Sequence, residues 1–516
     1  MKNNLASIYF VILLFSVFTI VSCSNEPKEI PIYEKDFCAS IHRNDSVTLS
    51  EQLKKVDTLM QTKTGIYVLE DGGNSMIARA WLSEYAEKTI DVQYFIFSTD
   101  NVGLIACDYL VRAANRGIKV RILVDDIMVD AEPHDILTMD SHENIEIKIY
   151  NPGTNIGKNI LQKIGKLKTD FRGANQRMHN KTFIVDEKVV ITGGRNIADE
   201  YFDYDHEYNF RDRDILLLGK TVKTVQTSFN DYWNSSYCIN IADLVKDKSI
   251  NNLDTSRFKR LHQYACNPEN FWPQVREKIT NIPFIFNELQ EQGKIIWTDS
   301  VSFVADIPGK NDGTKGLSGG GVCTSALIDL VKNAKNSIEI QSPYLITTEL
   351  GKKLFEDAIK RGVKIRILTN SLASTDNLEA FSGYKRDREK LLKTGVRIFE
   401  FKPDAKERFK IMTGELQTKI NYAPIFGLHA KTMVIDNEII VIGTFNLDPR
   451  SANLNTECLT IVKSKEITKG VLEGIETEFL PENSWETTLL WNPDKEAGIK
   501  KVVKAASRRV VPKSIL

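Results

Sequence analysis

A short cluster of polar residues occurs twice in this chain at a fixed interval, and this repeat limits the folds that the chain can adopt. In the first copy His179 is followed by Lys181, Asp186 and Asn196. The same residue types recur 250 residues later, as His429, Lys431, Asp436 and Asn446. One such cluster is a common chance match, whereas two copies in register indicate duplicated structure and shared chemistry. We therefore expect two similar lobes.

The segments around both copies alternate between helical and extended patterns. Residues 75–88 are expected to form a helix, and strands are expected at 90–96 and 118–124 with a helix between them. Strands at 337–341 and 363–368, again with a helix between them, repeat this order in the second half. Alternating helices and strands predict an α/β fold in which each lobe has a mainly parallel mixed sheet flanked by helices. The active site is expected between the lobes.

The length of 516 residues is consistent with about two to four domains. With 42% hydrophobic and 26% charged residues, the composition is that of a globular protein and not of a disordered or polytopic membrane protein. The repeated pattern lapses within 250–300, which places the lobe boundary there. We predict a signal peptide (1–22), a lipid-anchored tether (23–55), a first lobe (56–285), a second lobe (286–485) and a basic carboxyl-terminal tail (486–516).

The amino terminus has the pattern of an export signal. Lys2 precedes an apolar run over 8–20, and Val-Ser-Cys23 follows before a polar stretch. A small residue before the cysteine resembles a bacterial lipobox, where cleavage leaves Cys23 as a lipidated first residue. The alternative is an uncleaved amino-terminal helix, for which the run is short. We expect a bacterial membrane-associated lipoprotein that lies outside the cytoplasm.

The charge balance and the cysteine spacing argue against a nucleic-acid-binding protein and against a metalloprotein. The 68 basic residues equal the 68 acidic ones, so no global positive field favours nucleic acid. The cysteines contain no CxxC pair, and no metal-binding cluster lies near the repeats, so neither a metal nor another cofactor is expected. If Cys23 is the anchor, the pairing of the other six cysteines stays open, as does the oligomeric state.

Strand geometry predicts which side chains of each cluster point in the same direction. Side chains two apart on a strand share a face, so His179 and Lys181 should point together while Asn180 points away. Asp186 and Asp436 each end an apolar strand and open a tight turn. We place both aspartates among the catalytic residues of the motif, with turn formation as the alternative.

The residue types suit attack on a phosphodiester. Its negative charge repels nucleophiles, so a site needs cations near the non-bridging oxygens and a neutral nucleophile. Lys181 and Lys431 would supply the cations, and Asn196 and Asn446 would supply neutral hydrogen-bond donors. Of two imidazoles near neutral pH, one can attack phosphorus while the other transfers protons.

At this point the sequence resembles the phospholipase D superfamily, and most closely its bacterial cardiolipin synthase-like members. The resemblance spans roughly residues 60–480, nearly the whole mature chain. The phrases that carry it are 177–181, 193–197, 210–214, 369–376 and 445–451. It implies a phosphohistidine mechanism without a metal, with His179 as the nucleophile and His429 as the acid and base.

Each histidine also needs a partner that fixes its tautomer. In the second copy the family resemblance implies Glu457, which opens the strand that follows His429. For His179 in the first copy we favour Asp212, because it also lies just before a strand. Glu207 has the same sequence spacing as Glu457, and Asp214 would lie on the same strand face as Asp212, so both remain alternatives.

The leading expectation is a phosphatidyltransferase of cardiolipin synthase type that acts on phospholipids. A phospholipase D that releases phosphatidic acid is the second candidate. A nuclease of the same superfamily and an inactive lipid-anchored binding module are less favoured. Two basic stretches, residues 158–177 and 500–513, are expected either to contact a lipid surface or to be solvated charged segments.

Overall fold

The structure is a computed structural model in which residues 36–40, 47–128, 131–153, 171–245, 256–311, 314–412 and 424–516 are described. The predicted signal peptide, the predicted lipidation residue Cys23 and most of the predicted tether lie outside these ranges. So does the basic stretch from Lys158 to Lys168. None of the helices within the described ranges has the combined length and apolar character that crossing a bilayer requires.

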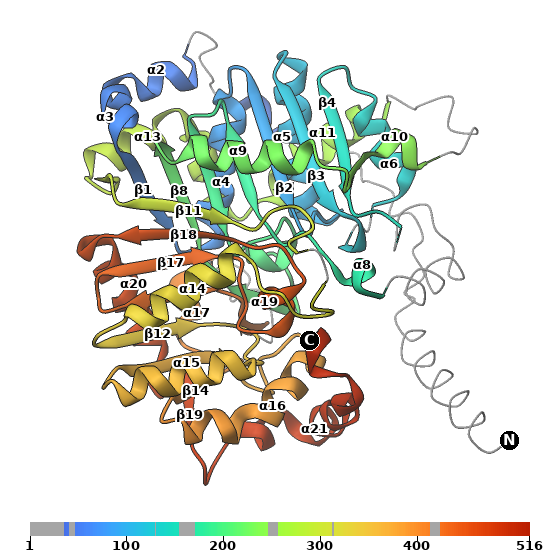
Figure 1. The fold of residues 1–516 in the computed structure, drawn as a ribbon. Helices are drawn as coiled ribbons and strands as arrows, with labels where there is room; N and C mark the ends of the chain where they lie inside the picture. The colour runs from blue at the N-terminus through green and yellow to red at the C-terminus, as the bar shows by residue number, and fades with distance from the viewer. Residues whose placement is uncertain are drawn as a thin grey trace, which may run out of the picture.

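The chain forms two stacked lobes, each built on one large mixed sheet (Figure 1). The first sheet has the order β10 (Ile296–Thr298), β1 (Thr64–Leu69), β8 (Asp214–Gly219), β6 (Val189–Gly193), β5 (Thr182–Val185), β2 (Thr89–Tyr94), β3 (Lys119–Asp125), β4 (Ile145–Tyr150) and β9 (Cys238–Asn240). The second has the order β11 (Val301–Ala305), β18 (Cys458–Lys463), β17 (Ile439–Gly443), β16 (Thr432–Ile435), β12 (Ser337–Gln341), β13 (Lys364–Asn370), β14 (Arg397–Phe401) and β19 (Ser484–Thr487).

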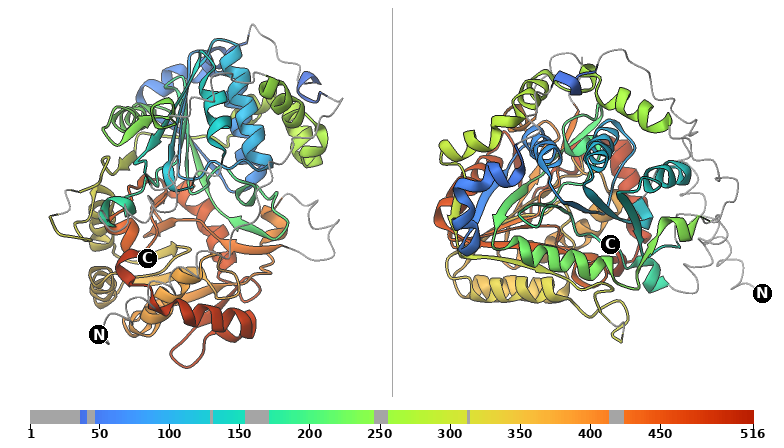
Figure 2. Two further views of the ribbon diagram at one scale, coloured as in Figure 1. Left: turned by 90° about the vertical axis from the view of Figure 1, so that its right-hand side faces the viewer. Right: turned by 90° about the horizontal axis from the view of Figure 1, so that it is seen from above.

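Helices cover the sheets, and in the first lobe they lie on both faces (Figure 2). The first lobe has α2 (Leu49–Leu53), α3 (Asp57–Thr62), α4 (Gly72–Tyr85), α5 (Asn101–Asn115), α6 (Pro133–Asp140), α8 (Phe171–Asn175), α9 (Val222–Trp233), α10 (Ile241–Leu244), α11 (Ser256–Ala265), α12 (Pro273–Thr280) and α13 (Ile282–Glu291). The second has α14 (Val322–Asn333), α15 (Glu349–Lys360), α16 (Leu378–Lys393), α17 (Arg408–Ile411), α19 (Pro449–Asn453), α20 (Lys465–Glu478) and α21 (Gly498–Ser507).

The same local signals build the crossover unit of each lobe. Asp100 caps the start of α5 by accepting a hydrogen bond from the backbone of Gly103, and Thr348 caps α15 in the same way. Gly117 and Gly362 follow these helices with φ of 91° and 94°, which a residue with a side chain rarely adopts. Each crossover therefore returns the chain as a parallel strand.

Parallel pairing is confined to these crossover strands. In the first sheet β2, β3 and β4 pair in parallel, and in the second β12, β13 and β14 do so. All other neighbours within the two sheets pair antiparallel, and two of these pairs, β5–β6 and β16–β17, are hairpins. The mixed α/β fold is confirmed, and its parallel part is smaller than the sequence pattern indicated.

The lobe boundary lies further along the chain than predicted. Residue 285 falls inside α13, and β10 still pairs with β1 of the first sheet. The chain changes sheet between Thr298 and Val301. Helices α11 to α13, which break the repeat, pack as an extra layer on the helices α4 and α5 of the first lobe.

Both terminal segments are partly folded, contrary to a simple tether and tail. Leu49 and Leu53 are buried in the first core. Residues Ser484–Thr487 form β19, and Ala505 is buried in the core of the second lobe. Cys38 is joined to Cys266 by a disulfide, which ties the start of the described chain to the first lobe.

A small sheet joins the lobes. Strand β7 (Tyr208–Arg211) of the first lobe pairs in parallel with β15 (Ile425–Leu428) of the second. An isolated parallel bridge between Met178 and Thr456 makes the equivalent connection from the other copy. These two connections bring the segments that carry His179 and His429 to the interface between the lobes.

Candidate active site

Each histidine is held by a carboxylate from the other lobe. Nδ1 of His179 lies 2.8 Å from an oxygen of Glu457, and Nδ1 of His429 lies 2.6 Å from an oxygen of Asp212. A carboxylate that accepts a hydrogen bond from the Nδ1–H group keeps the proton on Nδ1 and leaves Nε2 with its lone pair for reaction. The pairing predicted within each copy is therefore wrong, because the carboxylates are exchanged between the copies.

The backbone connections between the lobes explain the exchange. The amide of His179 donates to the carbonyl of Thr456 at 3.0 Å, and the amide of His429 donates to the carbonyl of Arg211 at 2.8 Å. The residue after each acceptor is the carboxylate that binds the ring. Register across the interface thus sets both histidine partners, in the same way that register sets neighbours within a sheet.

Asp212 is the structural counterpart of Glu457. Gly193 pairs with Asp214 and Gly443 pairs with Leu459, so each carboxylate lies two residues before its equivalent strand position. Glu207, which has the matching sequence spacing, is exposed to solvent.

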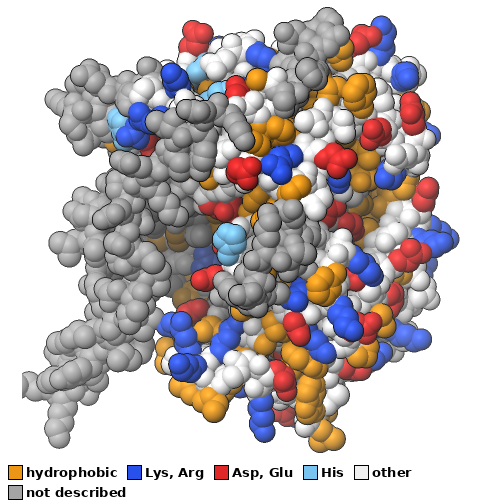
Figure 3. Space-filling view, turned by 180° about the vertical axis from the view of Figure 1, so that it is seen from behind, with side chains coloured by type: hydrophobic (Ala, Val, Ile, Leu, Met, Phe, Trp, Pro, Cys, Tyr) orange, Lys and Arg blue, Asp and Glu red, His pale blue; other side chains and the backbone are white. Residues whose placement is uncertain are grey.

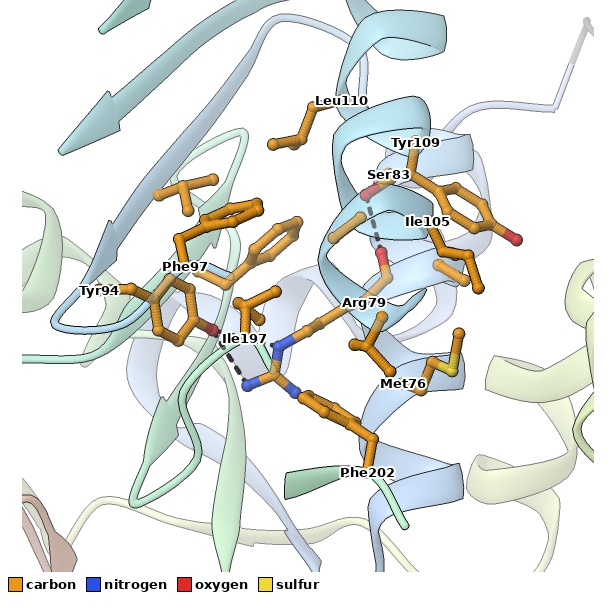
Figure 4. A pocket seen from close by; sticks show the side chains of 15 residues that line it. Met76, Arg79, Ser83, Tyr94, Phe97, Ile105, Tyr109, Leu110, Ile197 and Phe202 are labelled. Atoms are coloured by element: carbon orange, nitrogen blue, oxygen red, sulfur yellow. Dashed lines mark hydrogen bonds between the residues drawn. The ribbon is translucent and has the colours of Figure 1, made fainter. Parts of the chain in front are cut away.

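Asp214, the other alternative, has a separate role inside the first lobe. Its carboxylate accepts hydrogen bonds from Arg79 at 2.9 Å and from Ser75 at 2.7 Å. Arg79 also binds the hydroxyl of Tyr94 beside an apolar pocket between α4 and α5, and neither His179 nor His429 lines that pocket (Figure 4). Asp214 is thus a structural residue of the first lobe and not a histidine partner.

The two lysines are buried and influence each other. Lys181 is 1% exposed and Lys431 is 5% exposed. The ammonium of Lys181 donates to the carbonyl of His179 at 2.9 Å, and that of Lys431 lies 3.2 Å from Nε2 of His429. Burial and the positive charge of Lys431 lower the pKa of Lys181 to about 7, and burial lowers the pKa of Lys431 to about 8. The two copies of the motif therefore form one electrostatic unit.

Burial also keeps both imidazoles neutral. It lowers the pKa of His179 to about 4, with Glu457 opposing and Lys181 adding to the effect. It lowers the pKa of His429 to about 3, with Lys431 as the next cause. Although burial opposes ionisation, His429 holds the pKa of the Asp212 carboxyl well below its usual range. The free site therefore contains two neutral imidazoles between carboxylates and lysines.

The structure does not bring Asp186 and Asp436 to this site. The carboxylate of Asp186 accepts hydrogen bonds from the backbone amides of residues 87, 88 and 89 at 2.7 to 2.9 Å. Asp436 accepts from the amides of residues 335, 336 and 337 in the same manner. Both have φ of 53° in the tight turn after their strand. The motif aspartates thus tie a hairpin turn to the start of the neighbouring strand, and the catalytic role predicted for them is corrected to turn formation.

The two asparagines differ in their surroundings. The side-chain oxygen of Asn196 accepts from the amide of Ile96 at 3.2 Å. The side-chain oxygen of Asn446 is buried and has no hydrogen-bond partner in the part of the chain that the structure describes. A buried polar atom of this kind is costly unless something binds it. Asn446 is therefore the better placed of the two to meet a ligand.

The residues beside the asparagines also break the symmetry of the repeat. A side chain at Gly194 would collide with Asp212, since a Cβ there would lie 2.0 Å from its carboxylate. The equivalent residue, Thr444, instead donates its hydroxyl to Glu457 at 2.5 Å. Asp212 thus has room because residue 194 has no side chain, whereas Glu457 is bound by the hydroxyl of Thr444.

Several residues of the site are not among those predicted from the sequence. The ring centroids of Phe95 and His179 lie 5.2 Å apart. Those of Tyr201 and Phe210 lie 5.0 Å and 4.7 Å from the ring centroid of His429. Asp448 is buried, and burial raises its pKa to about 7. Phe210 and Asp448 fall within phrases that carried the family resemblance, whereas Phe95 gave only the signal of an apolar residue at the end of a strand.

Two overlapping groups of possible metal ligands lie in the first lobe, apart from this site. They are Asp36, Cys38 and Cys266, and Asp108, His262 and Cys266. Both include Cys266, whose sulfur is bonded to Cys38. The disulfide occupies the sulfur atoms that such a metal would need.

Comparison with known proteins gives the geometry a context. The family model described as cardiolipin synthase, phospholipase D-like domain, matches residues 83–233 and 327–478, one match in each lobe. Cardiolipin synthase C of Escherichia coli K12 is 34% identical over 408 residues, which cover 78% of this chain and 82% of that protein. An uncharacterised protein of Helicobacter pylori J99 is 33% identical over 434 residues, covering 83% and 82%.

A solved structure also shares the fold. The crystal structure of phosphatidylserine synthase from Haemophilus influenzae Rd KW20 covers 90% of this chain and 100% of its own, with a TM-score of 0.55 and 14% identity. The family matches place one HxK motif in each repeat, where the structure shows one half of a shared site. The chain therefore belongs to the phospholipase D superfamily, in its family of cardiolipin synthase phospholipase D-like domains.

Proposed function

We propose that this protein is a phosphatidyltransferase of cardiolipin synthase type, which moves a phosphatidyl group between phospholipids through a phosphohistidine. The observation that carries the proposal is the pair of exchanged contacts, His179 with Glu457 and His429 with Asp212, set between two buried lysines. The names of the cardiolipin synthase and phosphatidylserine synthase to which the chain is similar support phospholipid head-group exchange.

In the first step Nε2 of His179 forms a bond to phosphorus while the bond from phosphorus to the leaving alcohol oxygen breaks. His429 donates its proton to that oxygen. Lys181 and Lys431 balance the charge on the non-bridging oxygens. The ammonium of Lys431 lies against the ring of His429, 3.0 Å from Nδ1 and 3.2 Å from Nε2, whereas the hydrogen bond of Lys181 goes to the carbonyl of His179. This difference supports His179 as the nucleophile.

In the second step His429 accepts the proton of a hydroxyl on the acceptor lipid. The hydroxyl oxygen bonds to phosphorus as the bond to His179 breaks, which restores both imidazoles. The acid form of His429 must arise when the substrate binds, because its pKa in the free site is about 3. A bound phosphodiester supplies negative charge between the lysines and raises that pKa.

The lysines and histidines predict an unusual pH profile. The nucleophile must be neutral, and the lowered pKa of His179 keeps it so as pH falls, until about 4. Lys181 must be charged, and its lowered pKa removes that charge as pH rises past about 7. We expect kcat/KM, which reports the free enzyme, to decline on the acid side near pH 4 to 5 and on the alkaline side near pH 7 to 8.

The alkaline decline should shift to higher pH in kcat, because bound phosphodiester stabilises the charged lysines. Lys181→Arg provides the control, since a guanidinium stays charged over this range. The kcat/KM of this variant should be lower than that of the wild type at every pH. Its alkaline decline should be smaller, because the arginine does not lose its charge as Lys181 does. An acid limb at the ordinary histidine pKa of about 6.5 would contradict the buried, neutral imidazoles.

The experiment that tests the function is lipid analysis of cells that produce the wild type or His179→Ala. A diphosphatidyl lipid that appears only with the wild type supports the transferase. Phosphatidic acid without such a lipid would show a hydrolase, which is the second candidate from the sequence. Identical lipid profiles from well-expressed, folded proteins would exclude both activities on cellular lipids.

We also propose that the chain is exported and anchored through lipid on Cys23. The amino-terminal pattern supports this location, and the disulfide Cys38–Cys266 is typical of proteins outside the reducing cytoplasm. Fatty-acid label that persists in Cys23→Ser would overturn the anchor.

A further inference from the structure

The carboxyl-terminal helix α21 is already packed against the second lobe through one face. Ala505 is buried and Val502 is packed against the core of the second lobe. The ammonium of Lys501 donates to the carbonyls of Ala373 and Thr375, both at 3.0 Å. The position of this helix is therefore fixed by its inner face, and its outer face is not needed to fold it onto the lobe.

The outer face is nevertheless apolar. Ile499 is 83% exposed and Val503 is 63% exposed, one helical turn apart, and Val510 just beyond the helix is 67% exposed. Polar residues normally occupy the solvent face of a helix whose other face packs on a core. Ile499 and Val503 instead form an apolar stripe, with Lys500 and Lys504 along one side of it.

A loop directly before this helix adds a second apolar element. Leu489, Leu490 and Trp491 are 57%, 98% and 45% exposed. The loop is a closed turn, because the amide of Thr488 donates to the carbonyl of Trp491 at 2.9 Å and the amide of Trp491 donates back to the Thr488 hydroxyl at 3.1 Å. The exposure of these three side chains is thus built into the turn.

The loop and α21 lie at the same end of the molecule, the end of the second lobe away from the first (Figures 1 and 2). Seen from behind, this end shows apolar and basic side chains close together, with some acidic ones among them (Figure 3). We call the six exposed apolar residues the C-terminal patch: Leu489, Leu490, Trp491, Ile499, Val503 and Val510.

The charge around the patch is mainly positive, and Asp494 beside it is paired with Lys385 and Arg388. Residues 495–513 contain seven basic residues and one acidic residue, Glu496. Arg508 pairs with Glu379 and Lys513 pairs with Asp387 on the inner side. Lys500, Lys504 and Arg509 are exposed and make no ion pair with any residue that the structure describes. Lys500 and Lys504 lie along one side of the stripe, and Arg509 lies just beyond the helix.

We propose that the C-terminal patch docks on the surface of an anionic phospholipid bilayer. Apolar side chains that enter the boundary of headgroups and acyl chains, with lysine and arginine at headgroup level, match the chemistry of interfacial binding. Tryptophan favours the same depth because its ring is apolar and its N–H is polar. The charge complementarity selects an anionic lipid surface over an uncharged one. The inference does not depend on the chemistry of the histidines.

The test uses the full chain with its native amino terminus, carrying His179→Ala so that no lipid is converted. It is reconstituted into vesicles of phosphatidylethanolamine with about one third phosphatidylglycerol, with or without acyl chains brominated near the headgroup. The quenching of Trp491 is the difference between this protein and the same protein with Trp491→Phe. Because the readout is local, an anchor elsewhere in the chain does not produce it.

We expect bromolipid to quench Trp491 in anionic vesicles, and the quenching to fall in uncharged phosphatidylcholine vesicles and in high salt. Leu490→Glu combined with Val503→Glu should weaken it by at least about tenfold. Phe284→Glu is the matched control, because Phe284 is 60% exposed on α13 of the first lobe and should leave the quenching unchanged. The melting temperatures of all variants should match that of the His179→Ala parent, since every further substitution is at an exposed position.

Absence of quenching in the anionic vesicles would overturn the proposal, as would equal quenching by the patch variant and its parent. Dimers in lipid-free detergent solution that dissociate on Leu490→Glu would show instead that a second copy of the chain covers the patch. Loss of phosphatidyl transfer in cells with normal quenching would leave the docking proposal intact and count only against the proposed function.

Discussion

Replacing His179 by Ala is expected to abolish covalent capture of a phosphatidyl group, whereas His429→Ala retains it. A donor lipid with a good leaving group needs little acid assistance, so the His429 variant should still form the bond to His179 and then stall. Radiolabel from the phosphatidyl group should remain on that protein after denaturation. Overall turnover should fall on the order of 10⁴-fold or more in both variants.

The two variants act as controls for each other, because each removes one imidazole from the same buried site. Label on His429 in the His179 variant, with none on His179 in the wild type, would reverse the assignment. Absence of label in every protein, with transfer intact in the wild type, would show direct transfer without a phosphohistidine.

Neutralising the carboxylates should affect the histidine of the opposite lobe. Glu457→Gln removes the acceptor that lies 2.8 Å from His179, although Glu457 follows the second motif in sequence. Asp212→Asn does the same to His429. An amide can stabilise the wrong tautomer of the ring, so each change should lower turnover by about 10²- to 10⁴-fold. Glu457→Gln should also slow formation of the labelled enzyme, while Asp212→Asn with a good leaving group should still form it.

Glu207→Gln is the matched control. Glu207 has the sequence spacing from His179 that Glu457 has from His429, yet it is exposed, so its variant should keep wild-type turnover within about twofold. A large effect of Glu207→Gln, or loss of labelling in Asp212→Asn and not in Glu457→Gln, would favour pairing within each copy and refute the exchanged arrangement.

The duplicated motif predicted much of the fold, because periodicity and spacing are local properties. The crossover units around α5 and α15 follow from apolar periodicity, a capping residue and a glycine stop. The lobe boundary was harder, since α11 to α13 have no equivalent in the second half and obscure the repeat. Hairpins also replaced much of the expected parallel pairing.

The site was predictable in its residue types and not in its partnerships. His179, Lys181, His429 and Lys431 stand out because one pattern occurs twice. The exchange of Glu457 and Asp212 depends on the backbone pairing of Arg211 with Leu428 and of Thr456 with Met178, which joins residues more than 200 positions apart. A single sequence contains no signal for such register. It therefore predicts a carboxylate partner for each histidine within the same copy of the motif, and this prediction is wrong. The catalytic role predicted for Asp186 and Asp436 is wrong for a related reason. A turn residue that is repeated in both copies gives the same sequence pattern as a repeated catalytic residue.

The exchanged carboxylates also bear on how the enzyme is made. A chain that emerges from the ribosome amino terminus first can complete its first lobe well before Glu457 is available. His179 in such an intermediate lacks the group that sets its tautomer, and no second imidazole is present to protonate a leaving group. A truncated product that ends before His429 therefore lacks both groups. We therefore expect the site to be complete only when both halves have folded together, because each histidine takes its carboxylate from the other half.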